Sequence, residues 1–160
     1  MIFVTVGTAR DFSRLIKKID EIAKDLNYEI IVQRGNTEYK PKNCKSFTFI
    51  SRDNFLNYVK KADIIITHGG AGSIIDSLKY NKPTIVVPRR KMFNEHRNDH
   101  QVDITKELEG GGRVLACYNI NNLKKKIREA KKFKLIMREG DMERIKKILN
   151  DFIKSSIRHS

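Results

Sequence analysis

The sequence has only two cysteines, no long apolar run, and few acidic residues for its length of 160. Cys44 and Cys117 stand far apart, and neither belongs to a Cys-x-x-Cys pair, which argues against a disulfide framework or a zinc site. Reduced thiols, as in the cytosol, are the simplest interpretation. No segment approaches the roughly 20 apolar residues that cross a bilayer, and the apolar start at 2–6 is too short for a secretory signal. We therefore expect any membrane role to be peripheral.

The shortage of acids leaves a strongly basic chain. Lysine and arginine outnumber aspartate and glutamate 33 to 19, which gives a net charge of +14. Such a charge suits anionic partners, namely nucleotide phosphates, anionic lipids or nucleic acids, without choosing among them. The basic residues lack interleaved aromatic residues, and no RNA-binding or DNA-binding motif is present. We therefore expect no nucleic-acid partner.

Hydrophobic periodicity alternates between that of strands and that of helices along the whole chain. Short apolar or β-branched runs predict strands at 2–6, 29–33, 46–50, 63–67, 84–88 and 113–117. Helical spacing predicts helices at 12–26 and near 53–61, 71–80 and 98–109. Continuous apolar strands separated by amphipathic helices are typical of a parallel sheet covered on both faces. The sequence thus predicts one doubly wound α/β domain over 1–160.

A glycine-rich segment, "ITHGGAGSIID" at 66–76, joins a predicted strand to a predicted helix. In a doubly wound sheet, ligands bind outside the carboxyl ends of the strands. Gly69, Gly70 and Gly72 allow close approach of the backbone, and the free N–H groups of a helix starting near Ala71 suit a phosphate or pyrophosphate. Ser73 can donate a hydroxyl, and Asp76 can accept from a ribose hydroxyl. An ordinary glycine-rich turn is the alternative.

Three other glycine motifs do not fit this segment. A Walker loop needs Gly-Lys-Ser/Thr, whereas Ser73 follows Gly72 directly. The dinucleotide fingerprint needs a glycine where Ile75 stands and should follow the first strand. An esterase oxyanion loop would need a G-x-S-x-G nucleophile elbow, which the chain lacks. An NAD-binding protein and a hydrolase are therefore disfavoured.

The sequence resembles the nucleotide-sugar-binding C-terminal half of GT-B glycosyltransferases of family 28. The resemblance is carried by "IFVTVGTARDFSRLI", by "FISRDNFLNYVKKADIIITHGGAGSIIDSLKYNKPTIVVPRR" and by "NEHRNDHQ", which together cover most of residues 1–118. The greatest likeness is to the small catalytic subunits of two-chain UDP-N-acetylglucosamine transferases of dolichol-linked oligosaccharide and exopolysaccharide synthesis.

The resemblance assigns the following roles to individual positions. Gly7 and Thr8 would face the diphosphate, Phe49 and Ile50 would receive the uracil edge, and residues 98–101 would hold sugar hydroxyls. The implied substrate-binding residues are Gly7, Thr8, Phe49, Ile50, His68, Gly69, Gly70, Ala71, Gly72, Ser73, Asp76, Asn98, Asp99 and Gln101. Structural alternatives are a helix cap for Thr8, a core position for Phe49 and Ile50, and a solvated turn for "NEHRNDHQ".

The resemblance also implies a reaction and a partner. A complete GT-B enzyme has a preceding acceptor-binding domain, so we expect a membrane-anchored partner chain that holds a lipid-linked acceptor, with this chain at the cytoplasmic face of the membrane. The implied reaction is inverting sugar transfer from a UDP-sugar, without a metal or another cofactor. Candidates for the general base are His68, Asp99, His100 and a residue of the partner. The alternative function is a non-catalytic UDP-sugar-binding subunit with a regulatory or scaffolding role.

A basic amphipathic helix is expected near 141–157. Apolar residues repeat at helical spacing there, namely Ile145, Ile148, Leu149, Phe152 and Ile153. Residues 121–160 hold 13 lysines and arginines against 5 acids. The apolar stripe packs on the chain's own sheet, docks on the membrane subunit as the resemblance implies, or does both, and basic residues beside anionic lipid would add to docking.

Overall fold

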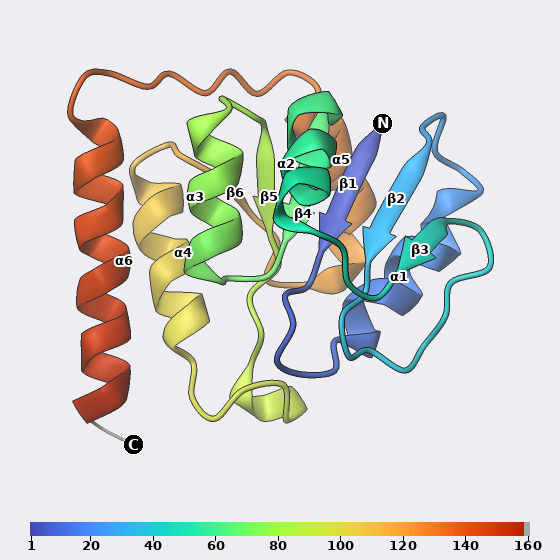
Figure 1. The fold of residues 1–160 in the computed structure, drawn as a ribbon, viewed down its shortest axis with the longest axis horizontal. Helices are drawn as coiled ribbons and strands as arrows, with labels where there is room; N and C mark the ends of the chain where they lie inside the picture. Colours follow the sequence, from blue (N-terminus) through green and yellow to red (C-terminus); the bar gives the residue numbers. More distant parts are fainter. Residues whose placement is uncertain (159–160) are drawn as a thin grey trace.

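Parallel strands form the centre of the computed structural model, which describes residues 1–158 (Figure 1). The six strands of this part of the chain lie in the order β3-β2-β1-β4-β5-β6, and every neighbouring pair is parallel. The strands are β1 (Ile2–Thr5), β2 (Ile30–Gln33), β3 (Lys45–Phe47), β4 (Ile64–Thr67), β5 (Thr84–Val86) and β6 (Leu115–Ala116). The predicted doubly wound α/β fold is therefore confirmed.

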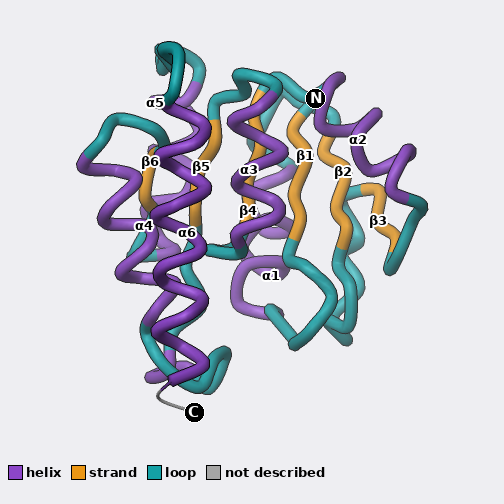
Figure 2. Tube along the Cα trace, turned by 60° about the vertical axis from the view of Figure 1, so that its left-hand side comes forward, coloured by secondary structure: helices purple, strands orange, loops and turns teal. Residues whose placement is uncertain are grey.

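Helices cover both faces of this sheet because its apolar side chains point alternately to either face. Ile2 and Val4 of β1 pack with helices α1 and α5, whereas Phe3 between them packs toward α2. One face carries α1 (Ser13–Ala23) and α5 (Leu123–Ala130). The other carries α2 (Arg52–Lys61), α3 (Ala71–Lys79) and α4 (His100–Gly110), as Figure 2 shows.

Several elements differ in extent from the prediction. The strands are shorter: β1, β3 and β5 end earlier than predicted, β2 and β4 begin one residue later, and β6 is shorter at both ends. Helix α5 was not predicted, although Leu123, Ile127 and Ala130 occur at helical spacing and are buried. The three lysines at 124–126 stand between Leu123 and Ile127 and make the apolar spacing hard to recognise in the sequence. Two short 3-10 helices, η1 (Lys91–Phe93) and η2 (Ile120–Asn122), interrupt the connections after β5 and β6.

The C-terminal helix α6 (Asp141–Arg158) packs on α3 and α4 rather than on the sheet (Figure 2). Its apolar stripe is divided along its length: Ile145 and Leu149 are buried in the cluster with α3 and α4, whereas Ile153 and Ile157 are exposed. Of the uses left open for this stripe, packing within the chain is therefore correct for Ile145 and Leu149, although they pack on α3 and α4 instead of the sheet, and docking on a partner stays a prediction for the exposed part. No helix of residues 1–158 is long and apolar enough to cross a membrane.

The strand order creates a crevice between β1 and β4. From β1 the chain proceeds to β2 and β3 on one side, and from β4 it proceeds to β5 and β6 on the other. The loops that leave the carboxyl ends of β1 and β4 consequently diverge, and such a switch point is where doubly wound sheets bind ligands. The β4–α3 loop is the glycine-rich segment.

Candidate functional site

Two adjoining cavities form a groove along the carboxyl ends of β1 and β4. Their volumes are about 360 Å³ and about 310 Å³, and both are lined by Gly7, Thr8, Gly72 and Ser73. We call them the aromatic half and the cationic half. The aromatic half is completed by Thr5, Gln33, Phe49, Ile50, Arg52, Phe55 and Asp76. The cationic half is completed by Val6, Ala9, Arg10, His68, Gly70, Arg89, His96 and Gln101.

Phe49 and Ile50 stand at the wall of the aromatic half and do not belong to the core. Phe49 is 53% exposed, and Ile50 is partly exposed. Both follow β3, and their segment is fastened by Gln33, whose amide nitrogen donates to the carbonyl oxygens of Thr48 and Gly7 at 2.9 and 3.2 Å. An exposed aromatic ring beside fixed backbone suits a planar base.

Asp76 lines the aromatic half and stands on the second turn of α3. Its carboxylate is 5% exposed and accepts two hydrogen bonds from the Arg52 guanidinium, both at 2.6 Å. Arg52 is the first residue of α2 and is largely exposed, so this ion pair is a surface pair in its energetics. A carboxylate has about four acceptor sites, so the pair leaves capacity for hydroxyl donors from a ligand.

Unpaired backbone N–H groups occur in both loops that border the groove. The N–H groups of residues 7–11, in the β1–α1 loop, make no hydrogen bond within the described part of the chain. At the start of α3, Gly70 has no side-chain cap, and the first backbone bond of the helix is donated by Ile74. The N–H groups of 70–73 are therefore free as well. Facing sets of N–H groups at a helix start form a site for an anion.

The glycines of this site serve two different needs. A Cβ at Gly7 would lie 2.8 Å from Nε2 of His68, and one at Gly70 would overlap the same ring, so both glycines make room for His68. A Cβ at Gly69 would lie 2.7 Å from the Gln101 side chain. Gly72 differs, since a Cβ there would meet nothing within 4 Å and would point into open space. Gly72 thus leaves room for something outside the chain.

Arg89 binds the backbone of the β1–α1 loop. Its guanidinium is 3% exposed and donates to three backbone carbonyl oxygens, those of Val6 (2.7 Å), Asp11 (2.8 Å) and Arg10 (3.0 Å). It also lies over the Phe12 ring at 4.7 Å and forms no ion pair with any residue of 1–158. Burial lowers its pKa, and it still carries a buried positive charge that lacks a paired carboxylate.

The positive charges of Arg10 and Arg89 act on the histidines of the cationic half, while the Glu95 and Asp11 carboxylates act on Arg89 and raise its pKa against the effect of burial. Burial, and then the positive charge of Arg89, lower the pKa of His68 from its usual 6.5 to about 3, so its ring is neutral at pH 7. The pKa of His96 is also lowered, first by burial and then by the charges of Arg10 and Arg89. A buried charge without a partner is unfavourable, so an anionic ligand would stabilise this half of the groove.

Gln101 was predicted to hold a sugar hydroxyl, and the structure gives it a structural task as well. Its side-chain oxygen accepts from the N–H groups of Gly69 (3.1 Å) and Arg89 (3.0 Å), which ties the β4–α3 loop to the segment after β5. Only its amide nitrogen is left to face the cationic half.

The other polar residues of the predicted sugar cluster lie outside both halves of the groove. Asn98 accepts from the N–H of His100, Asp99 accepts from the N–H of Lys91 at 2.9 Å, and His100 contacts Ser156 of α6. His100 therefore stands at the α4–α6 contact, away from the groove, and the structure does not support it as a candidate base. These side chains are instead used to shape the segment between β5 and α4.

Sequence reasoning missed nine groove residues, and five of these carry an amide, guanidinium or imidazole side chain. These are Gln33, Arg52, Arg10, Arg89 and His96. Gln33 carried a signal, since it ends an otherwise apolar strand, and so did Arg89, which directly follows the strand-ending Pro88. A polar residue at the carboxyl end of a parallel strand points toward the ligand edge of the sheet.

We expect Arg89→Lys to lower affinity for UDP about 30-fold while leaving affinity for uridine within about twofold, as one or two lost charge-assisted hydrogen bonds imply. A lysine retains the charge, but its compact ammonium lacks the planar guanidinium fork by which Arg89 reaches three carbonyl oxygens, so the loop would be held less firmly and its free amides would bind a diphosphate less well. Calorimetric titrations of the unchanged protein and of Arg89→Lys, each with UDP and with uridine, measure the two affinities. Equal losses for the two ligands would contradict it.

Comparison with solved structures gives the class of the fold. The NMR structure of ALG13 superposes with a TM-score of 0.62 at 21% identity, and the match covers 90% of this chain and 93% of that one. The calicheamicin glycosyltransferase CalG4 superposes with a TM-score of 0.60 at 16% identity, over 96% of this chain and 39% of that chain. The chain thus has the Rossmann-like fold of the C-terminal half of a GT-B glycosyltransferase.

Sequence comparison identifies the family. The chain belongs to the glycosyltransferase family 28 C-terminal domain family, whose model matches residues 1–155. It is 33% identical over 126 residues to UDP-N-acetylglucosamine transferase subunit ALG13 of Mus musculus, and equally to that of Homo sapiens. These matches cover 72% of this chain but only 10% and 11% of the relatives, so the chain spans about a tenth of their length.

Proposed function

We propose that this chain is the donor-binding catalytic subunit of an inverting glycosyltransferase that uses a UDP-sugar. The observation that carries the proposal is the presence of unpaired N–H groups in residues 7–11 and 70–73, in the two loops that line the groove, beside the buried charge of Arg89. Such a site suits a diphosphate, while the Phe49 wall and the Asp76 carboxylate, in the aromatic half, suit a base and a ribose. The names of the mouse and human relatives favour N-acetylglucosamine as the sugar.

In the proposed reaction, the oxygen of an acceptor hydroxyl forms a bond to the anomeric carbon of the donor. The bond between that carbon and the β-phosphate oxygen breaks, UDP leaves with the electron pair, and a base takes the hydroxyl proton. The N–H groups of both loops would stabilise the charge that develops on UDP, because they are already oriented toward it. No metal or other cofactor is part of this proposal.

The base is proposed to come from a partner chain. His68, whose pKa is about 3, is too weak a base for efficient proton transfer near neutral pH, although its neutral ring can still donate or accept a hydrogen bond. We propose a membrane-anchored partner that holds a lipid-linked acceptor, which would bring this chain to the cytoplasmic face of the membrane. The exposed Ile153 of α6 is left as a contact for that partner.

The test is sugar transfer measured with and without the acceptor-binding partner. We expect UDP binding by the chain alone, little transfer by the chain alone, and transfer from UDP-N-acetylglucosamine once the partner is added. Transfer that persists when the chain's own groove is blocked would show that it is a non-catalytic subunit. Rapid transfer to a lipid acceptor by this chain alone would overturn the requirement for a partner.

We expect Asp76→Ala to weaken UDP binding about 10-fold to 100-fold, the range that follows from losing hydrogen bonds to a charged group. The free energy of unfolding should fall by only about 1 kcal/mol, because the partner of the lost carboxylate is an exposed arginine. Arg52→Ala is the matched control, since it removes the same ion pair but keeps the carboxylate. If Arg52→Ala weakens UDP binding as much as Asp76→Ala, the ribose role of Asp76 is wrong.

A further inference from the structure

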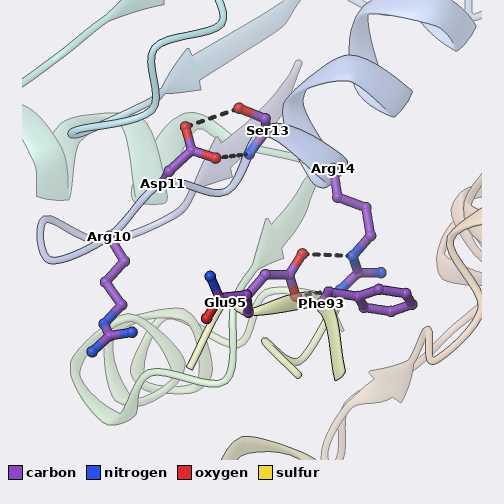
Figure 3. A pocket seen from close by; sticks show the side chains of 7 residues that line it. Arg10, Asp11, Ser13, Arg14, Phe93 and Glu95 are labelled. Atoms are coloured by element: carbon purple, nitrogen blue, oxygen red, sulfur yellow. Dashed lines mark hydrogen bonds and ion pairs between the residues drawn. The ribbon is translucent and has the colours of Figure 1, made fainter. Parts of the chain in front are cut away.

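A third cavity lies beside the cationic half of the groove, and its volume is about 650 Å³. It is lined by residues of the β1–α1 loop and the first turn of α1 on one side, and by the last residue of η1 and the two residues after it on the other (Figure 3). Arg10 lines both this cavity and the cationic half, so the two spaces adjoin. A molecule held here would therefore lie next to the phosphate and sugar end of a bound nucleotide-sugar.

Most charged groups of this cavity are already paired and form its fixed walls. Glu95 is buried and accepts from Nε and Nη2 of Arg14 at 2.7 and 2.9 Å, and from the N–H of Arg90 at 3.0 Å. The Asp11 carboxylate accepts from the N–H and hydroxyl of Ser13 at 3.0 and 2.8 Å, and from the N–H of Glu38 at 3.1 Å. Figure 3 shows the Arg14–Glu95 and Asp11–Ser13 pairs, with Arg10 standing apart from both.

Three groups remain free for a ligand. The side chains of Arg10 and Asn94 make no hydrogen bond or ion pair within residues 1–158. The ring of Phe93 is 46% exposed, and the Arg14 guanidinium lies 4.6 Å from its centroid and so holds it in place. Asn94 has a φ of 56°, in the left-handed region, which fixes its backbone at the end of η1.

The chemistry of these three groups fits a glycosyl phosphate. A guanidinium is suited to binding a phosphate, a carboxamide can both donate to and accept from hydroxyls, and an exposed aromatic face provides an apolar surface for a sugar ring. The donor nucleotide is already accounted for by the groove. The second molecule that the reaction needs is the acceptor, which on the proposed function is lipid-linked. A 26% identical relative from Thermosipho melanesiensis is named for an acceptor in which an N-acetylmuramyl sugar is joined to undecaprenol through a pyrophosphoryl group, so we take a glycosyl phosphate as the acceptor's end.

We propose that this cavity binds the sugar-phosphate end of the acceptor, with Phe93 beneath the sugar, Asn94 at its hydroxyls and Arg10 at its phosphate. This chain would then orient the acceptor as well as the donor. The inference rests on the proposed function, because it takes the acceptor's chemistry from it.

The first experiment is an NMR titration of the isolated chain, saturated with UDP, using N-acetylglucosamine 1-phosphate, inorganic phosphate and vesicles of anionic phospholipid as separate probes. The UDP step tests the proposed function by itself. We expect the sugar phosphate to shift the amide signals of residues 10 and 93–95. Equal shifts with inorganic phosphate would show that the cavity binds phosphate without recognising a sugar, which would overturn the sugar site. Shifts with vesicles alone would overturn the proposal in favour of a lipid headgroup.

The second experiment uses variants that touch this cavity without lining the donor groove. Phe93→Leu keeps an apolar side chain but removes the ring, and Asn94→Gly removes the carboxamide while keeping a residue that accepts a positive φ. We expect each to weaken sugar-phosphate binding about fivefold to tenfold and to change UDP affinity less than twofold. Arg97→Ala, which changes an exposed residue of the same segment outside this cavity, is the control and should leave sugar-phosphate binding unchanged. Unchanged sugar-phosphate binding in both Phe93→Leu and Asn94→Gly would overturn the proposal.

Discussion

Replacing Gly72 by valine is expected to abolish measurable UDP binding, a loss of more than about 100-fold, without unfolding the protein. In the structure a Cβ at this position meets nothing within 4 Å, and Gly72 lines both halves of the groove. The added methyl groups would thus occupy the space above the start of α3, where a diphosphate must approach free N–H groups. UDP affinity is lost because the valine side chain excludes the ligand, whereas the fold itself has room for that side chain.

Two further variants separate an effect on UDP binding from an effect on stability. Gly72→Ala should weaken UDP binding less, about 10-fold, and should raise the free energy of unfolding by about 0.5 kcal/mol, since alanine restricts the unfolded chain. Gly70→Ala should instead destabilise the protein, because its Cβ would overlap the His68 ring. Calorimetry with UDP and thermal unfolding measure both effects. A Gly72→Val protein that binds UDP normally would falsify the position of the diphosphate.

Replacing Leu149 by serine is expected to lower the free energy of unfolding by about 4 kcal/mol, near the upper range for loss of a large buried side chain. Leu149 is completely buried between α6, α3 and α4, in a cluster that includes Ile74, Leu78 and Leu108. Because domains of this kind are stable by only about 5–15 kcal/mol, the variant should approach unfolding at physiological temperature. Deletion of residues 141–160 removes Ile145 as well and should abolish the cooperative transition.

Ile153→Ser is the matched control on the same helix. Ile153 is 43% exposed, so its loss should change the free energy of unfolding by less than about 0.5 kcal/mol. The same variant tests docking on the proposed partner, because it removes an exposed apolar group without harming the fold. Thermal melting separates the two roles. Equal melting temperatures for Leu149→Ser and the unchanged protein would show that α6 is not part of the core.

Helix α6 shows how far a pattern of apolar residues can be interpreted from sequence. The stripe from Ile145 to Ile153 predicted an amphipathic helix, and the helix is present at Asp141–Arg158. Periodicity gives the face of a helix that is apolar, but it does not say what covers that face. The structure places α3 and α4 against the first two turns of the stripe and leaves Ile153 exposed.

The groove likewise contains residues that could be predicted from sequence and residues that could not. Residues 68–76 could be recognised from sequence because a strand, a glycine cluster and a helix start are contiguous, and the position of a ligand edge follows from the fold class. The strand-end positions of Gln33 and Arg89 indicate this edge in general, but their partners in the groove could not be predicted, because those partners lie in other segments of the chain. Their roles depend on bonds between segments far apart in the chain, such as Arg89 to Val6 at 2.7 Å.

By itself, the sequence determined the alternation of strands and helices, the parallel sheet and the glycine-rich loop at its carboxyl edge, since these follow from local periodicity and from the backbone freedom of glycine. Only the tertiary structure decided which amides remain unpaired, which charges lack a counter-ion, and that His100 faces α6 instead of the groove. Burial and pairing are properties of neighbours in space. They depend on how distant segments pack, which no local pattern of residues contains.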